Sequence, residues 1–160
     1  MDLTQLPHGD IHDFDFLVGR WRVHNRRLMT RLRGAAGWTE IDATHRCEPW
    51  LNGGANVDQI DFPSLGWSGL TLRTFDVAQR RWSIYWINSR DGVLTPPVHG
   101  GFDGNRGLFY GEDTDDGRAV QVRFIWTRQG RDAAHWEQAF SLDGREWETN
   151  WTMAFTRIGD

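Results

Sequence analysis

The chain has 160 residues and a formal net charge of −4, and its composition is 39% hydrophobic and 25% charged. These values fit one globular domain, which we place at residues 1–160. They argue against a nucleic-acid partner, which requires a basic surface, and the short apolar runs exclude a transmembrane helix and a membrane partner. Residues 1–5 lack the features of a secretory signal, so we expect a cytoplasmic protein.

The residues that follow predict one short helical turn and then strands only. The helical turn falls within residues 11–17. After it, alternating runs rich in Val, Ile, Thr, Trp, Phe and Tyr recur between Gly and Asp turns, a pattern typical of β-strands. The predicted strands are residues 20–30, 38–47, 55–62, 67–75, 82–89, 97–102, 108–113, 119–127, 134–142 and 146–157.

The connections between these strands are short and contain residues that tolerate a positive φ. Asp103-Gly104-Asn105, Asp116-Gly117 and Asp143-Gly144 are hairpin reversals of this kind. Neighbours in sequence should therefore be neighbours in space. Because an up-and-down meander of about ten strands leaves exposed edges unless it closes, we predict an all-β, closed antiparallel barrel with room for one small ligand.

Residues 14–21, FDFLVGRW, resemble the opening of lipocalin-like barrels, in which Gly-x-Trp follows a short helix and starts the first strand. Other segments are similar to a bacterial calycin-type barrel family described only as a domain of unknown function. These segments are residues 25–28, 83–86, 109–111, 123–126, 136–138 and 147–151. The resemblance covers nearly the whole chain and implies a barrel, but it implies no reaction.

A more distant resemblance is to the nitrobindins, ten-stranded barrels whose haem iron is held by a histidine on a late strand. The last predicted strand of this chain has no histidine, and His135 on the preceding strand is the nearest substitute. We therefore expect no haem. No nucleotide-binding fingerprint is present either, so we expect no cofactor.

The last three predicted strands can be aligned through their turns, because antiparallel partners have nearly constant summed positions. This alignment places Phe124 opposite Trp136, and Trp136 opposite Trp151. The same face holds Val120, Phe140 and Trp147, aligned in that order. The opposite face holds three polar residues, Arg123, Glu137 and Asn150.

This polar face has two interpretations. In the first, the aromatic face packs inside, and the polar residues form a solvated, salt-bridged surface. In the second, the polar face points into a dry cavity, where Glu137 acts as acid or base and Arg123 holds an anion. The second predicts a cofactor-independent enzyme, such as an isomerase, cyclase or lyase, with Glu137 and Arg123 as catalytic residues.

Other residues predict a binding site for a small molecule. If Trp21 points inward, then Asn25 and Arg27 point inward with it by alternation, and Arg27 near the barrel mouth can anchor a carboxylate. Alternatively, Arg27 lies where the strand leaves the sheet. Trp86, predicted opposite Thr71, shares a face with Asn88. The predicted ligand-binding residues are Trp21, Asn25, Arg27, Trp86, Asn88, Asn150 and Trp151.

These residues predict a mostly apolar aromatic or acyl ligand of roughly drug size, with one anionic or carbonyl end. The six histidines show no metal-binding spacing, so we expect no metal site. The single cysteine, Cys47, has only His45 as a neighbour on its strand face, and we expect it to be inert. Residues 82–87 are apolar on both strand faces, which predicts a homodimer.

Overall fold

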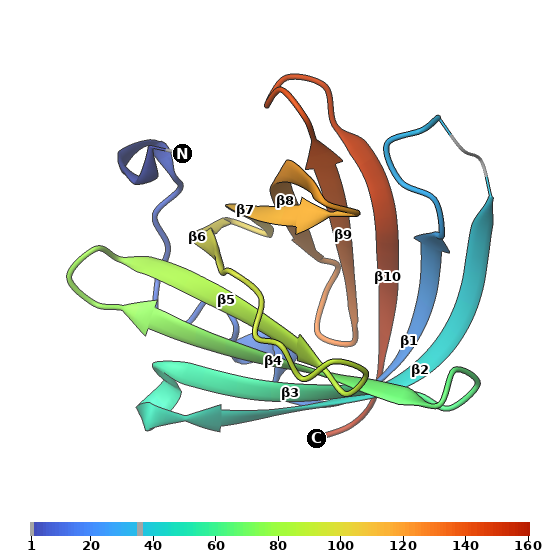
Figure 1. The fold of residues 1–160 in the computed structure, drawn as a ribbon. Helices are drawn as coiled ribbons and strands as arrows, with labels where there is room; N and C mark the ends of the chain where they lie inside the picture. The colour runs from blue at the N-terminus through green and yellow to red at the C-terminus, as the bar shows by residue number, and fades with distance from the viewer. Residues whose placement is uncertain (1, 35–36) are drawn as a thin grey trace.

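The computed structural model describes residues 2–34 and 37–160, which form a closed barrel of ten antiparallel strands (Figure 1). The order around the barrel is β1-β10-β9-β8-β7-β6-β5-β4-β3-β2, so each strand pairs with its neighbour in sequence, and β1 closes the barrel against β10. The predicted up-and-down barrel is therefore confirmed.

The strands follow the predicted runs, with ends that differ by a few residues. They are β1 Gly19–Leu28, β2 Trp38–Trp50, β3 Ala55–Phe62, β4 Trp67–Asp76, β5 Arg81–Asn88, β6 Val98–Asp103, β7 Arg106–Asp115, β8 Arg118–Arg128, β9 Ala133–Ser141 and β10 Glu148–Gly159. In residues 2–34 and 37–160, helical structure is limited to three 3-10 helices, η1 Leu3–Gln5, η2 Asp15–Leu17 and η3 Leu51–Gly53. Only η2 lies in the segment predicted to be helical. No helix in the described part of the chain is long and apolar enough to cross a membrane.

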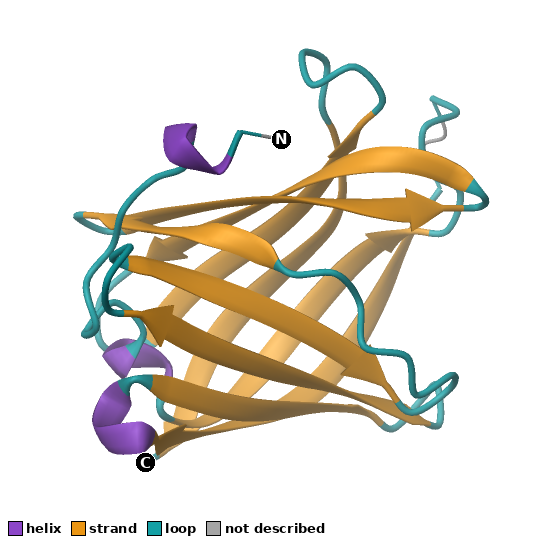
Figure 2. Cartoon of the chain, turned by 60° about the vertical axis from the view of Figure 1, so that its left-hand side comes forward, coloured by secondary structure: helices purple, strands orange, loops and turns teal. Residues whose placement is uncertain are grey.

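One end of the barrel is closed by the segment that precedes β1. Figure 2 shows η2 and η3 at this end, near the C-terminus. Phe14 is buried there, and its ring packs against an aromatic cluster of Trp82, Phe102, Phe109 and Trp126. The indole of Trp21 donates to the carbonyl of Leu17 at 2.9 Å, which fastens the segment to β1. This closed end is the floor of the barrel.

The wall of the barrel is incomplete as a sheet between β5 and β6. These strands pair at three positions only, the last being Ile84 with Val98. Beyond that point the loop of residues 89–97 takes the place of a strand, and the backbone N–H of Thr95 donates to the carbonyl of Trp86 at 2.8 Å. The loop therefore forms part of the wall on the side of the open end.

The pairing of the last three strands differs from the predicted alignment. Phe124 pairs with Gln138, and Trp136 pairs with Met153. The β9–β10 connection is a six-residue loop, in which Asp143 accepts backbone N–H bonds from residues 145 and 146, and it is not a two-residue turn. A bulge between Thr149 and Trp151 then inserts Asn150 as an extra residue.

This bulge changes which residues point inward. Asn150 is buried inside the barrel, although it was predicted to share a face with Glu137. Trp147, predicted to align with Phe140 inside, precedes β10 and lies beside Tyr110, with ring centroids 6.0 Å apart. On β8 and β9 the aromatic face lies inside, as in the first of the two interpretations, because the register differs from the predicted one by an even number of residues.

Candidate functional site

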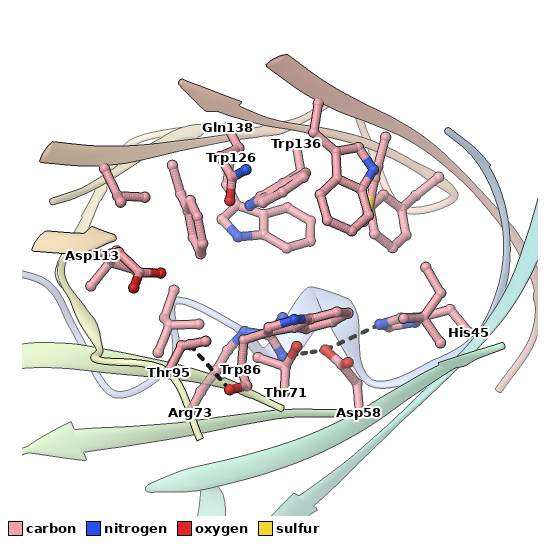
Figure 3. Close-up of a pocket in the computed structure, with 18 of the residues that line it drawn as sticks. His45, Asp58, Thr71, Arg73, Trp86, Thr95, Asp113, Trp126, Trp136 and Gln138 are labelled. Atoms are coloured by element: carbon pink, nitrogen blue, oxygen red, sulfur yellow. Dashed lines mark hydrogen bonds and ion pairs between the residues drawn. The ribbon is translucent and has the colours of Figure 1, made fainter. Parts of the chain in front are cut away.

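The barrel encloses a cavity of about 100 Å³ above the floor (Figure 3). Its walls are largely aromatic and aliphatic, because the inward positions of β5, β8, β9 and β10 carry large apolar side chains. Four tryptophans line it, namely Trp86, Trp126, Trp136 and Trp151. Such a lining favours an apolar ring or chain as the occupant.

Trp151 is the centre of the aromatic wall. Its indole N–H donates to Oδ1 of the buried Asn25 on β1 at 2.9 Å. Trp136 and Trp86 meet it edge to face, with ring centroids 5.6 and 6.0 Å from its own. The hydrogen bond and the two ring contacts fix the orientation of Trp151 before any ligand enters.

Trp86 lies over a position that has no side chain. A Cβ atom added at Gly69 on β4 would lie 1.9 Å from the Trp86 ring. The two residues are neighbours across β4 and β5, where Gly69 pairs with Asn88 and Thr71 pairs with Trp86, as the sequence predicted for Thr71. Gly69 thus provides the space for an indole that forms one wall of the cavity.

A charged cluster lies deep in the cavity, on three consecutive strands. Nε2 of His45 on β2 is 3.1 Å from Oδ2 of Asp58 on β3, and Nη1 of Arg73 on β4 is 2.6 Å from the same oxygen. Nη1 of Arg73 also donates to Oδ1 of Asn56 at 2.9 Å. All of these side chains are buried. Burial opposes ionisation of Asp58, but Arg73 and His45 outweigh it and hold the pKa of this carboxyl far below its usual range.

The guanidinium of Arg73 links this cluster to the floor. Its Cζ lies 5.0 Å from the ring centroid of Phe14 and 5.7 Å from that of Trp126. The His45 ring meets Phe155 edge to face at 5.2 Å. The ion pair is therefore enclosed by aromatic rings, and the ring of Phe14 anchors the N-terminal segment against it.

A second polar group lies on the opposite side of the cavity. Asp113 on β7 lines it together with Thr95 and Gln138 (Figure 3). Nε2 of Gln138 donates to Oδ1 of Asn150 at 2.9 Å, so Asn150 positions a lining residue from behind. The cavity is thus apolar around its middle and polar at a few separate points, as ligand sites commonly are.

Arginines gather beside this wall at the open end. Cζ of Arg27 lies 4.4 Å from the Trp151 ring centroid, and Cζ of Arg90 lies 4.1 Å from that of Trp67. Burial, together with the charges of Arg31 and Arg90, lowers the pKa of Arg27 to about 10. Among the described residues, Arg31 is paired with Asp115, whereas Arg27 and Arg90 have no carboxylate partner. These two guanidinium groups form a site of positive charge next to the aromatic wall.

The remaining predicted ligand contacts lie elsewhere. Trp21 is buried at the floor and does not line the cavity; Cζ of Arg157 lies 4.2 Å from its ring centroid. Oδ1 of Asn88 accepts the backbone N–H of Arg90 at 2.9 Å, so this side chain caps the turn after β5. Of the predicted binding residues, the structure brings together Trp86 and Trp151 in the wall, with Asn25 and Asn150 behind it and Arg27 beside it.

The residues predicted for catalysis are on the outside. Val122, Phe124, Trp136 and Gln138 line the cavity, so the alternate positions Arg123 and Glu137 point away from it. Cζ of Arg123 lies 4.7 Å from the ring centroid of Trp147. The interpretation in which Arg123 and Glu137 face a dry cavity is therefore wrong; both side chains are half-buried on the outer face, and no ion pair joins them in the described part of the chain. His135 shares their outward face.

The buried cluster was missed by the sequence analysis, which considered His45 only as a partner of Cys47. The available signal was one polar residue at an inward position on each of three adjacent strands, namely His45, Asp58 and Arg73. Burial raises the pKa of the Cys47 thiol to about 12, so this group stays protonated. The residues described contain no group of three or more His, Cys, Asp or Glu side chains that could hold a metal ion.

Comparisons of the sequence with protein-family models and with curated proteins gave no match. The site is therefore interpreted from its own geometry.

Proposed function

We propose that the protein binds one small, largely apolar organic molecule, aromatic or acyl, inside the barrel. The observation that carries this proposal is the cavity walled by four tryptophans, one of which is fixed by a buried asparagine. A barrel without a binding role has no need of such a space, because side chains normally fill protein interiors to crystal-like density.

The size of the cavity sets the size of the ligand body. About 100 Å³ is below the roughly 300–1,000 Å³ of sites for drug-sized molecules and close to the ~150 Å³ of a cavity that accepts benzene. The part of the ligand inside the barrel is therefore smaller than the drug-sized molecule that the sequence predicted. It has the size of about one ring or a short acyl chain.

The charge beside the open end supports an anionic end on this molecule. Arg27 contacts the ring of Trp151, and its pKa is lowered first by burial and then by the charges of two neighbouring arginines. A carboxylate held between Arg27 and Arg90 would relieve this repulsion and accept bidentate hydrogen bonds. At the floor Asp58 already pairs with Arg73, so the anionic end belongs at the mouth and the apolar end inside.

The test is calorimetric titration with benzoate and with toluene, which share a ring and differ in charge. We expect saturable binding of both by the wild-type protein, and a loss of at least about tenfold in benzoate affinity in Arg27→Met with little change for toluene. Arg123→Met is the matched control, because Arg123 is an arginine next to a tryptophan on the outer face. Absence of saturable binding for both compounds would contradict the proposal.

A further inference from the structure

One carboxylate in the cavity wall has no charged partner. Asp113 on β7 is half-buried and lines the cavity, and Figure 3 shows its carboxylate pointing into this space. Its Oδ1 accepts the backbone N–H of the next residue, Thr114, at 2.7 Å. Within residues 2–34 and 37–160, no side chain donates a hydrogen bond to this carboxylate or forms an ion pair with it. Its Oδ2 is therefore free to accept a hydrogen bond from a molecule in the cavity.

The next inward position on the same strand is occupied by an acidic residue that does have partners. Asp115 lies two residues beyond Asp113, so both side chains are on the inner face of β7. Asp115 is buried, and its carboxylate lies 2.7 Å from Nη2 of Arg31 and 3.6 Å from Nη2 of Arg118. The arginines at this end of the barrel are thus directed to Asp115, and the charge of Asp113 is left for another group to balance.

The polar side chains that line the cavity together with Asp113 use their donors elsewhere. Oγ1 of Thr95 donates to the carbonyl of Trp86 at 3.1 Å, and Nε2 of Gln138 donates to Oδ1 of Asn150 at 2.9 Å. A carboxyl group accepts hydrogen bonds in either protonation state, and buried or half-buried acceptors are normally satisfied. The partner that Asp113 lacks is therefore an N–H or O–H donor.

The arginines at the mouth show that the site carries both signs of charge. Arg27 on β1 and Arg90 after β5 have no carboxylate partner among the described residues. Around the barrel, three strands separate β7 from β1 on one side and five on the other, so Asp113 and Arg27 lie on well-separated parts of the wall. A molecule complementary to both carries a positive and a negative group.

We propose that the ligand carries an amino group and that Asp113 accepts a hydrogen bond from it. This inference rests on the proposed function and narrows it to a class of ligand, an amphoteric molecule with a small apolar body, an amino group and a carboxylate. An amine is favoured over a hydroxyl because, when protonated, it also balances the charge of Asp113. Asp113 then selects for the amino group, Arg27 for the carboxylate, and the tryptophans for the apolar body.

Benzylamine and ethylbenzene form the matched probe pair, because they have nearly the same shape and only benzylamine carries a protonated amine at pH 7. We expect the ratio of benzylamine to ethylbenzene affinity, measured by calorimetry, to fall by at least about tenfold from the wild-type protein to Asp113→Asn. This variant keeps the size of the side chain and removes its charge. Glu137→Gln is the matched control, because it removes a half-buried carboxylate from the outer face of the same barrel wall.

A second measurement needs no variant. If benzylamine occupies the cavity, toluene should compete with it, and the apparent Kd of benzylamine should rise with the fraction of protein that toluene occupies. An amine held by acidic groups on the outer surface of this chain, whose net charge is −4, would be unaffected by toluene. The competition therefore locates the amine and does not depend on the folding of a mutant.

The outcomes separate the two proposals. If ethylbenzene and toluene bind but benzylamine does not, or the affinity ratio is unchanged in Asp113→Asn, the amine inference is wrong while the cavity remains a binding site. An equal fall of the ratio in Glu137→Gln, or an absence of competition by toluene, also overturns the inference. If ethylbenzene, toluene and benzoate all fail to bind, the proposed function fails, and the amine inference fails with it.

Discussion

The Asp58 side chain determines the stability of the buried cluster, because it accepts hydrogen bonds from both His45 and Arg73. Replacing it by Asn removes the negative charge and leaves the Arg73 guanidinium buried without an ion-pair partner. We expect Asp58→Asn to reduce the free energy of unfolding by about 3–5 kcal/mol, measured by urea denaturation at pH 7. Asp113→Asn is the control, since Asp113 is only half-buried and has no ion pair in the described chain; a loss of similar size there would contradict this account.

The same residue predicts how stability changes in acid. The pKa of Asp58 is lowered by folding from its ordinary value of 3.8, so its contribution is fully present above about pH 4. The contribution is lost as pH falls below that value toward the depressed pKa of the folded state. The unfolding free energy of the wild-type protein should therefore drop more steeply below pH 4 than that of Asp58→Asn. Parallel curves for the two proteins would show that the carboxylate is not stabilised by its partners.

At the scale of the strands, the contact between Gly69 on β4 and Trp86 on β5 controls the shape of the cavity. A methyl group at position 69 overlaps the indole, which must move from its place in the wall. We expect Gly69→Ala to cost about 1–3 kcal/mol of stability and to weaken toluene binding, as seen by denaturation and calorimetry. Gly37→Ala is the control, because an added Cβ there meets no atom within 4 Å. Unchanged binding in Gly69→Ala would mean that Trp86 does not shape the site.

The strands themselves were predictable because their signals are local. Alternating apolar residues identify β3 and β4, and the Asp116-Gly117 pair adopts the positive φ values of 50° and 76° that a tight hairpin requires. The β9–β10 connection was not predictable from Asp143-Gly144, since Asp143 and Ser141 hydrogen-bond within a longer loop. The bulge at Asn150 then reversed the predicted inward or outward direction of Glu148 and Thr149, the residues of β10 that precede it.

The site was predictable only in part, for a related reason. Trp86, Trp151 and Asn25 were found because large or polar residues at inward positions of single strands can be recognised one at a time. The cluster of His45, Asp58 and Arg73 takes one residue from each of three strands. Its prediction therefore requires knowing how the three strands are aligned. No spacing along the chain predicts this cluster, because the lengths of the connecting turns decide which residues of adjacent strands lie side by side.

At the scale of the whole molecule, the outer face of β3 to β5 carries an apolar patch. Leu70 pairs with Ile87, and Leu72 pairs with both Tyr85 and Val57, on the side opposite the cavity. We propose that this face is the interface of a homodimer, and we expect a dimer in sedimentation equilibrium at micromolar concentration. Leu72→Glu should shift it to monomer, whereas Val77→Glu, at an exposed apolar residue in the β4–β5 turn, should not. A wild-type monomer under these conditions would exclude this interface.

The closure of the barrel by β1 and β10 also has a consequence for folding. These strands pair over eight positions, among them Arg27 with Trp151, although they stand at opposite ends of the meander. Contacts so distant in sequence form slowly, so we expect a folding time of milliseconds to seconds.

Trp151, Met153 and Phe155 complete the cavity wall from β10, and Asn25 on β1 orients Trp151. A nascent chain that has formed β1 to β9 therefore has no enclosed pocket, and it acquires one only when β10 docks.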